Sequence, residues 1–172
     1  KIDQGIDTKK YQITPRTLIF IFNEQDQVLL LRGAQNKRIW SNLYNGIGGH
    51  IEAGEDIIEA ALRELREETG FRHVDLDFCG QVMIDVEPRM GVGMFIFRGL
   101  YAGEVIKPSD EGELVWIGFK TLHSLPTVED LPILVPFVAE YPPSSPLIIG
   151  KYAYDSQGRL QILFQNDSFK KK

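Results

Sequence analysis

Three glutamates, Glu64, Glu67 and Glu68, follow one another at helical spacing within residues 55–69. On a helix their carboxylates share one face, and Arg63 lies beside them. Carboxylates this close repel one another unless a cation lies among them, and their hard oxygen atoms suit Mg²⁺, Mn²⁺ or Ca²⁺. The spacing alone also fits a solvated helix face, because Glu is a good helix former. The carboxylates therefore indicate a metal site only where a longer pattern supports it.

The same segment predicts the helix that carries these side chains. A stripe suited to packing consists of Ile58, Leu62, Leu65 and Thr69. Gly70 follows the last turn and predicts a left-handed helix end. Glu59 and Glu67 lie four residues before and after Arg63, so we expect both to pair with it.

The longer pattern runs from Gly49 to Phe71 and reads GHIEAGEDIIEAALRELREETGF. It resembles the signature of the Nudix hydrolase superfamily: Gly, five residues, Glu, seven residues, Arg-Glu-apolar-X-Glu-Glu-X-Gly-apolar. The nine specified positions are all met, by Gly49, Glu55, Arg63, Glu64, Leu65, Glu67, Glu68, Gly70 and Phe71. At roughly 7% for each specified residue type, the probability of a chance match is below about one in a million.

This resemblance implies a fold and an activity. Members of the superfamily fold as an α/β/α sandwich around a mixed β-sheet, in which the signature forms a loop–helix–loop. They hydrolyse nucleoside diphosphates linked to another moiety and use Mg²⁺ or Mn²⁺. We therefore expect an α/β protein with a single Nudix domain over residues 1–172, acting as a hydrolase with Mg²⁺ as its cofactor and Mn²⁺ as the other candidate ion.

The resemblance also implies roles for individual residues. The metal ligands would be Glu64, Glu67, Glu68 and the carbonyl group of Gly48. Arg63 would orient the glutamates by ion pairing, whereas Glu55, Gly49 and Gly70 would be structural. An acidic residue beyond the helix often completes the site, and Glu111 is the candidate here, with Glu113 close behind. Glu64 or Glu111 would act as the general base, although the loop that contains Glu111 fits a solvated acidic turn equally well.

Three residues outside the signature concern the substrate. Asn45 precedes the signature, and Glu129 and Asp130 follow it. In similar MutT-like members, which remove oxidised purine nucleoside triphosphates, residues at these places hydrogen-bond the base. The implied reaction converts a modified purine nucleoside triphosphate to the monophosphate and pyrophosphate. Oxidation of guanine turns N7 from an acceptor into a donor, which an ionised Asp130 would accept. Asn45 also fits a turn, and Asp130 also fits a helix N-cap.

Two other functions stay open. Pro88 lies 17 residues beyond Phe71, near a proline of ADP-ribose-cleaving members, which favours an ADP-ribose or other sugar-nucleotide pyrophosphatase. A catalytically silent Nudix-like domain that senses a nucleotide is the alternative of another class, although silent members usually lose signature glutamates that are retained here. A base would stack on Phe22, Tyr44 or Phe137, each of which also fits the core.

Hydrophobic patterning predicts the elements that position these residues. Strands are expected over residues 17–22, 28–31, 44–47, 78–86, 93–101, 114–119, 151–154 and 160–165. Helices are expected over residues 55–69 and 130–140, and loops over 33–43 and 104–113. Hairpins at both ends with helices between them favour a mixed sheet.

Composition limits the partners and the location. The chain carries 19 basic and 24 acidic residues, a net charge of −5, which argues against the basic surface that binds a nucleic-acid polymer. We therefore expect a small-molecule nucleotide as partner. The longest apolar stretch, residues 131–139, is too short to cross a membrane, and the single cysteine, Cys79, excludes an intrachain disulfide. These features predict a cytoplasmic protein without a membrane partner and leave the oligomeric state open.

Overall fold

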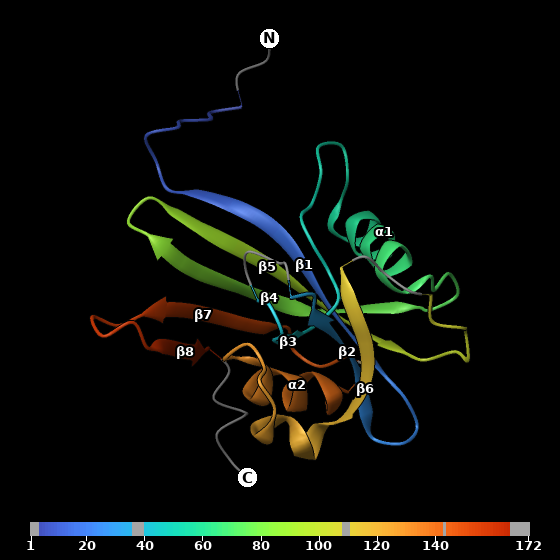
Figure 1. Ribbon diagram of the computed structural model, residues 1–172. Coiled ribbons are helices and arrows are strands. Elements are labelled where there is room, and N and C mark those ends of the chain that lie inside the picture. The colour runs from blue at the N-terminus through green and yellow to red at the C-terminus, as the bar shows by residue number, and fades with distance from the viewer. Residues whose placement is uncertain (1–3, 36–39, 108–110, 143, 166–172) are drawn as a thin grey trace.

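The computed structural model describes residues 4–35, 40–107, 111–142 and 144–165. Eight strands in this part of the chain form one sheet (Figure 1). They are β1 (Gln12–Phe22), β2 (Gln27–Gly33), β3 (Tyr44–Asn45), β4 (Leu76–Glu87), β5 (Met90–Leu100), β6 (Gly112–Gly118), β7 (Ile148–Tyr154) and β8 (Leu160–Phe164). The order is β3-β2-β1-β5-β4-β7-β8, and β6 pairs with β2. Since β1 runs parallel to β5 and β4 parallel to β7, whereas the other pairs are antiparallel, the expected mixed sheet is confirmed.

Successive side chains of β1 enter two different hydrophobic cores, as the alternation of a strand requires. One core contains Leu18, Phe20 and Phe22 of β1, together with Leu131, Leu134, Val135 and Val138 of α2 (Leu131–Ala139). The other contains Ile19 and Ile21 of β1, together with Ala61 and Leu65 of α1 (Ile57–Thr69). The sheet therefore lies between α1 on one face and α2 on the other (Figure 1). This arrangement is the α/β/α sandwich expected from the signature.

Caps define both ends of α1. The Asp56 carboxylate accepts hydrogen bonds from the N–H groups of Ile58 (2.8 Å) and Glu59 (2.9 Å), and the Glu59 carboxylate accepts one from the Asp56 N–H (2.9 Å). This reciprocal capping box satisfies backbone donors that the first turn leaves free. Gly70 ends the helix with φ 82°, as predicted. The helix begins two residues later than the expected range 55–69 because Asp56 serves as its cap.

The buried face of α1 differs from the predicted stripe. Ile58 and Leu62 are 49% and 38% exposed, so their part of that prediction is wrong. The buried residues are Ala60, Ala61, Leu65, Glu68 and Thr69. The side chains of the adjacent residues Ala60 and Ala61 are small, so this face of the helix can pack closely on the sheet. The face that packs on the sheet therefore extends around the helix to include Glu68.

Other element boundaries also differ from the sequence-based expectation. The strand expected at 44–47 is shortened to two residues, although Ile47 still forms an isolated bridge with Ile19. β1 starts five residues earlier than expected, and a 3₁₀ helix, η1 (Phe119–Ser124), follows β6. The helix expected at 130–140 is confirmed as α2. Neither α1, with 13 residues, nor α2, with 9, is long enough to span a membrane, and no other helix in the described part is longer.

The C-terminal hairpin, β7 and β8, completes the sheet beside β4. Gly80 has φ 151°, and a Cβ atom there would collide with the Ile148 carbonyl. β4 carries an irregularity between Phe78 and Gly80, next to the start of the pairing with β7. A glycine at this point therefore allows β7 to approach β4 closely. As a result, the C-terminal hairpin becomes part of the same sheet as β1.

Replacing Asp56 by Ala removes the acceptor for two backbone N–H groups of α1. We expect the free energy of unfolding to fall by about 1 kcal/mol, measured by urea denaturation. Asp75→Ala, which removes an exposed carboxylate with no side-chain hydrogen bond in the described structure, is the matched control and should change stability by less than about 0.5 kcal/mol. Equal effects of the two substitutions would show that the cap contributes nothing specific.

Candidate active site

Two glycines place the loop after β3 between β1 and α1. The Thr17 N–H donates to the Gly49 carbonyl (2.9 Å), and the Gly49 N–H donates to the Thr17 hydroxyl (3.4 Å). Gly48 has φ 139°, and a Cβ atom there would collide with the Thr17 carbonyl. A Cβ atom on Gly49 would collide with the Glu64 carboxylate. Gly48 is therefore required for the loop to lie against β1, whereas a side chain at Gly49 would displace the Glu64 carboxylate.

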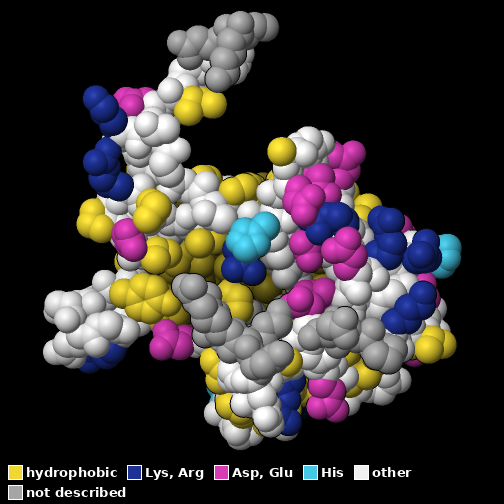
Figure 2. Space-filling model, turned by 45° about the horizontal axis from the view of Figure 1, so that its top comes forward, with side chains coloured by type: hydrophobic (Ala, Val, Ile, Leu, Met, Phe, Trp, Pro, Cys, Tyr) yellow, Lys and Arg dark blue, Asp and Glu magenta, His cyan; other side chains and the backbone are white. Residues whose placement is uncertain are grey.

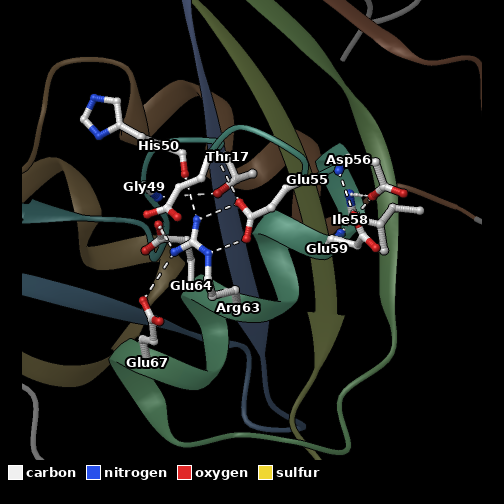
Figure 3. Close-up of polar contacts among 11 residues, drawn as sticks. Thr17, Gly49, His50, Glu55, Asp56, Ile58, Glu59, Arg63, Glu64 and Glu67 are labelled. Atoms are coloured by element: carbon white, nitrogen blue, oxygen red, sulfur yellow. Dashed lines mark hydrogen bonds and ion pairs between the residues drawn. The ribbon is translucent and has the colours of Figure 1, made fainter.

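Arg63 joins this loop to α1 (Figure 3). Its guanidinium donates to both carboxylate oxygens of Glu55, at 2.6 and 3.0 Å, and to Glu64 at 2.8 Å. It also donates to the carbonyl of His50 (2.9 Å) and to Glu67 (3.3 Å). These contacts raise the pKa of the guanidinium, with the hydrogen bond to Glu55 as the largest cause. The same bond is the main reason that the pKa of the Glu55 carboxyl is lowered.

Of the two partners expected for Arg63, one is found and one is not. Glu67 pairs with it as predicted, but Glu59 is occupied in the capping box at the start of α1 (Figure 3). Glu55, which precedes the helix, takes the place of Glu59 with two charged hydrogen bonds. The Arg63 side chain is only 22% exposed, so its hydrogen bonds are largely shielded from solvent.

The three signature glutamates have different surroundings. The Glu68 side chain is buried and accepts a hydrogen bond from the Gly48 N–H (3.2 Å). The Glu64 side chain is 14% exposed and bound to Arg63, whereas that of Glu67 is 59% exposed. Two of the three carboxylates are therefore packed against the protein, so these glutamates do not form a fully solvated helix face.

The donor chemistry fits a hard divalent cation. Glu64, Glu67 and Glu68 supply carboxylate oxygens and Gly48 supplies a carbonyl oxygen, as Mg²⁺ and Mn²⁺ prefer. Within the described ranges no three acidic, His or Cys side chains form a group that could already hold an ion. Glu64 instead bonds to Arg63, and Glu68 to the Gly48 N–H. The chain thus provides the right ligand types on α1 and on the loop that contacts it.

A cavity of about 590 Å³ connects the signature with the residues expected to bind the substrate. Its lining includes three residues expected at the metal and catalytic site, Gly48, Glu68 and Glu111. It also includes the three expected to bind the base, Asn45, Glu129 and Asp130. Figure 2 shows acidic side chains gathered beside a hollow lined by hydrophobic ones. Glu111 belongs to this cavity, immediately before β6, while its neighbours Ser109 and Asp110 lie outside the described residues.

The three expected base-binding residues occupy distinct places. Asn45 lies on β3 and its side-chain oxygen accepts a hydrogen bond from the Gly46 N–H (2.8 Å). Glu129 is exposed, whereas Asp130 is 9% exposed. Asp130 occupies the N-cap position just before α2, but its side chain makes no capping hydrogen bond, so the side chain does not serve as a helix cap.

Asp130 lies beside Tyr152 of β7, a neighbour that sequence reasoning missed. Burial raises the pKa of the Asp130 carboxyl to about 6. The Tyr152 hydroxyl favours the ionised form of Asp130, although the two make no hydrogen bond of ordinary geometry, and Tyr152 Oη is buried without a partner among the described residues. Burial, followed by the charge of Asp130, raises the pKa of Tyr152.

The aromatic residues of the cavity are also not those expected. Phe22, Tyr44 and Phe137 pack in or against the core next to α2 and are absent from the cavity lining. The aromatic side chains that line it are Trp40, Tyr152 and Tyr154. Trp40 could have been noticed as a large aromatic residue within a polar loop, but nothing local marks the two tyrosines. Pro88 lies in the turn between β4 and β5 and does not line this cavity.

The chain matches the model of the NUDIX domain over residues 13–138. It belongs to the Nudix hydrolase family. This match confirms the membership that the signature indicated. The matched region extends well beyond the signature on both sides.

Individual relatives give the likeness in detail. The chain is 50% identical over 71 residues to the m7GpppN-mRNA hydrolase NUDT17 of Xenopus laevis, covering 41% of this chain and 23% of that protein. It is 30% identical over 112 residues to the NAD-capped RNA hydrolase NudC of Pseudomonas aeruginosa, covering 64% and 38%. The chain thus spans well under half the length of these curated relatives. A crystal structure of a MutT protein from Bacillus halodurans is similar with a TM-score of 0.72 and 25% identity, covering 89% of this chain and 98% of that one.

Replacing Arg63 by Ala leaves Glu55 and Glu64 without their shared cation. We expect a loss of about 2 kcal/mol in the free energy of unfolding, within the range of about 1.5–3 kcal/mol for a hydrogen bond to a charged group, because water can replace the other contacts of a site that is partly open to solvent. Divalent-ion activation should also weaken, since the glutamates lose the group that orients them. Arg66→Ala, on the exposed side of the same helix, is the control for both urea denaturation and metal titration. An unchanged midpoint of unfolding for Arg63→Ala would contradict the network.

Proposed function

We propose that this chain hydrolyses a nucleoside diphosphate linked to another moiety, with Mg²⁺ as its cofactor. The observation that carries the proposal is the single cavity that joins Gly48, Glu68 and Glu111 with Asn45 and Asp130. One end offers oxygen ligands for a cation that would bridge to phosphates, and the other offers polar groups for a base. A substrate with both parts would occupy the whole cavity.

The favoured substrate is a modified purine nucleoside triphosphate, cleaved to the monophosphate and pyrophosphate. Asp130 supports this choice because it is buried in the cavity and free of a capping bond. When ionised, it would accept a hydrogen bond from an N7–H donor and repel an N7 acceptor. A buried group that is left unpaired by the wrong base supplies selectivity.

The chain's own residues have separate tasks in this reaction. Glu64, Glu67, Glu68 and the Gly48 carbonyl would hold Mg²⁺, which when bound polarises phosphoryl oxygens and lowers the pKa of an attacking water. Arg63 lowers the pKa of the Glu55 carboxyl and would hold Glu55 and Glu64 in orientation through its hydrogen bonds. Glu64 or Glu111 would accept the proton of the water.

A capped RNA is the second candidate substrate. The relatives NUDT17 and NudC are named for hydrolysis of m7GpppN-mRNA and NAD-capped RNA. The net charge of −5 provides no broad basic surface for an RNA chain, so we rank this candidate below a free nucleotide. ADP-ribose ranks lower still, because Pro88, which favoured it, lies outside the cavity lining.

A substrate panel with Mg²⁺ tests these assignments. It contains normal and oxidised purine nucleoside triphosphates, ADP-ribose, dinucleoside polyphosphates, NADH and the two kinds of capped RNA, with products identified. Selective release of pyrophosphate and a monophosphate from an oxidised purine triphosphate is the expected result. Faster cleavage of ADP-ribose or a capped RNA would reassign the substrate, and binding without turnover would support a silent nucleotide sensor.

Glu67→Gln tests the metal-centred chemistry with little change in shape. The side chain is mostly exposed, so the fold should persist while turnover falls by roughly 10²–10⁴-fold, the scale expected when a catalytic carboxylate is lost. Glu52→Gln, an exposed carboxyl before α1, is the control and should retain activity. Turnover that persists undiminished in Glu67→Gln or in EDTA would exclude this mechanism.

Asp130 should make base selectivity depend on pH. Its pKa of about 6 lies above the ordinary value of 3.8, so the carboxyl is protonated below about pH 6 and ionised above it. The ratio of kcat/KM for oxidised over normal purine triphosphate should therefore rise through pH 6, and this ratio cancels titrations common to both substrates. Asp130→Asn should give a low ratio that is flat with pH, whereas Glu129→Gln should keep the rise. A flat ratio in the wild-type protein would refute this role.

A further inference from the structure

Most of the charged side chains that line the cavity are acidic. Four are acidic, namely Glu68, Glu111, Glu129 and Asp130. Among the described lining residues, Arg16 is the one cationic side chain. Because nucleotide phosphates are anionic, each described charged residue of the lining opposes their entry into this cavity, with the exception of Arg16.

Arg16 reaches the cavity from β1, one residue before Thr17, which bonds to the signature loop. Its guanidinium lies over the ring of Trp40, 5.2 Å from the ring centroid. Both side chains line the cavity. Trp40 thus restricts where the guanidinium can lie.

The guanidinium of Arg16 has unused hydrogen-bonding capacity. It makes no hydrogen bond or ion pair with any residue in the described part of the chain. Burial lowers its pKa, and the charges of Glu64 and Glu68 act in the opposite direction. Since arginine stays protonated in proteins, a partly desolvated cation with five N–H donors faces the cavity. A contact with an aromatic ring offsets only part of the cost of desolvating that cation.

We propose that Arg16, held by Trp40, forms an anion subsite that binds a phosphoryl group of the ligand at the Glu68 end of the cavity. The position agrees with this ligand chemistry, because Glu64 and Glu68 act electrostatically on Arg16 and are the groups proposed to hold the cation. A planar guanidinium can bind two phosphate oxygens at once. The subsite deepens the proposed function, on which it rests for the identity of the anion.

Other arginines do not share these features. Arg32 also lies over an aromatic ring, that of Tyr44, at 5.9 Å, but it is absent from the cavity lining. Arg98 lies over Phe22, at 5.7 Å, and is likewise absent from the lining. Arg32 therefore provides a control with the same change in charge and a similar loss of a ring contact.

The test is calorimetric titration with inorganic pyrophosphate in Mg²⁺ buffer, which requires no turnover. We expect Arg16→Ala to weaken pyrophosphate affinity by roughly tenfold or more, the loss expected for one charge-assisted contact. Arg32→Ala should remain within about twofold of wild type. Arg16→Lys, which keeps the charge without the fork, should lie between Arg16→Ala and wild type. The midpoint of thermal unfolding of each variant confirms that folded protein is compared.

The outcomes separate this subsite from the proposed function. Equal affinity of wild type and Arg16→Ala, an equal loss in Arg32→Ala, or no pyrophosphate binding by wild type would overturn the subsite. A loss confined to Arg16 variants would support it even if no substrate in the panel were cleaved. Conversely, cleavage of a nucleotide with a KM unaffected by Arg16→Ala would leave the hydrolase in place and remove the subsite.

Discussion

Electrostatic repulsion among carboxylates is the constraint around which this site is built. Glu55, Glu64 and Glu67 all contact a single guanidinium, that of Arg63. Without such a cation, acidic groups this close would favour a looser helix start and a displaced loop. Arg63 also bonds to the His50 carbonyl, so the same interaction that offsets the charge fixes the backbone next to it.

The geometry of β1 couples the site to both cores. One set of its side chains packs against α1 and the alternate set against α2. Where β1 passes from its exposed to its buried half, Arg16 lines the cavity and Thr17, which is buried, bonds to the signature loop. A shift of this strand would therefore move the loop, the cavity wall and both helices together.

The sequence predicted those features that depend on local or short-range patterns. The signature, the helix end at Gly70 and the C-terminal hairpin all follow from residues close together in the chain, and the structure agrees with them. The pairing of Arg63 with Glu55 was missed because Glu55 precedes the helix, where helical spacing no longer applies. Likewise, Ile58 and Leu62 were assigned to the core because an apolar stripe does not reveal that two alanines bring a different face to the sheet.

Contacts over long separations could not be predicted from one sequence. Tyr152 reaches Asp130 only because β7 pairs with β4, and Arg16 meets Trp40 only because the loop before β3 returns to β1. Asp130 lines the cavity, yet the burial that changes its pKa became visible only in three dimensions. Side-chain type and spacing therefore point to candidate residues, whereas the surroundings that tune them depend on the fold.

The C-terminal hairpin has a consequence for how such a protein can diversify. β7 and β8 lie beyond residues 13–138, the span shared with the family model, yet Tyr152, Tyr154 and Leu160 form part of the cavity wall. The carboxylates of α1 lie on the other side of the family boundary. Substitutions in the hairpin can therefore reshape this cavity wall while the residues that match the family model stay unchanged, and exchange of the hairpin between relatives would alter the wall without touching α1.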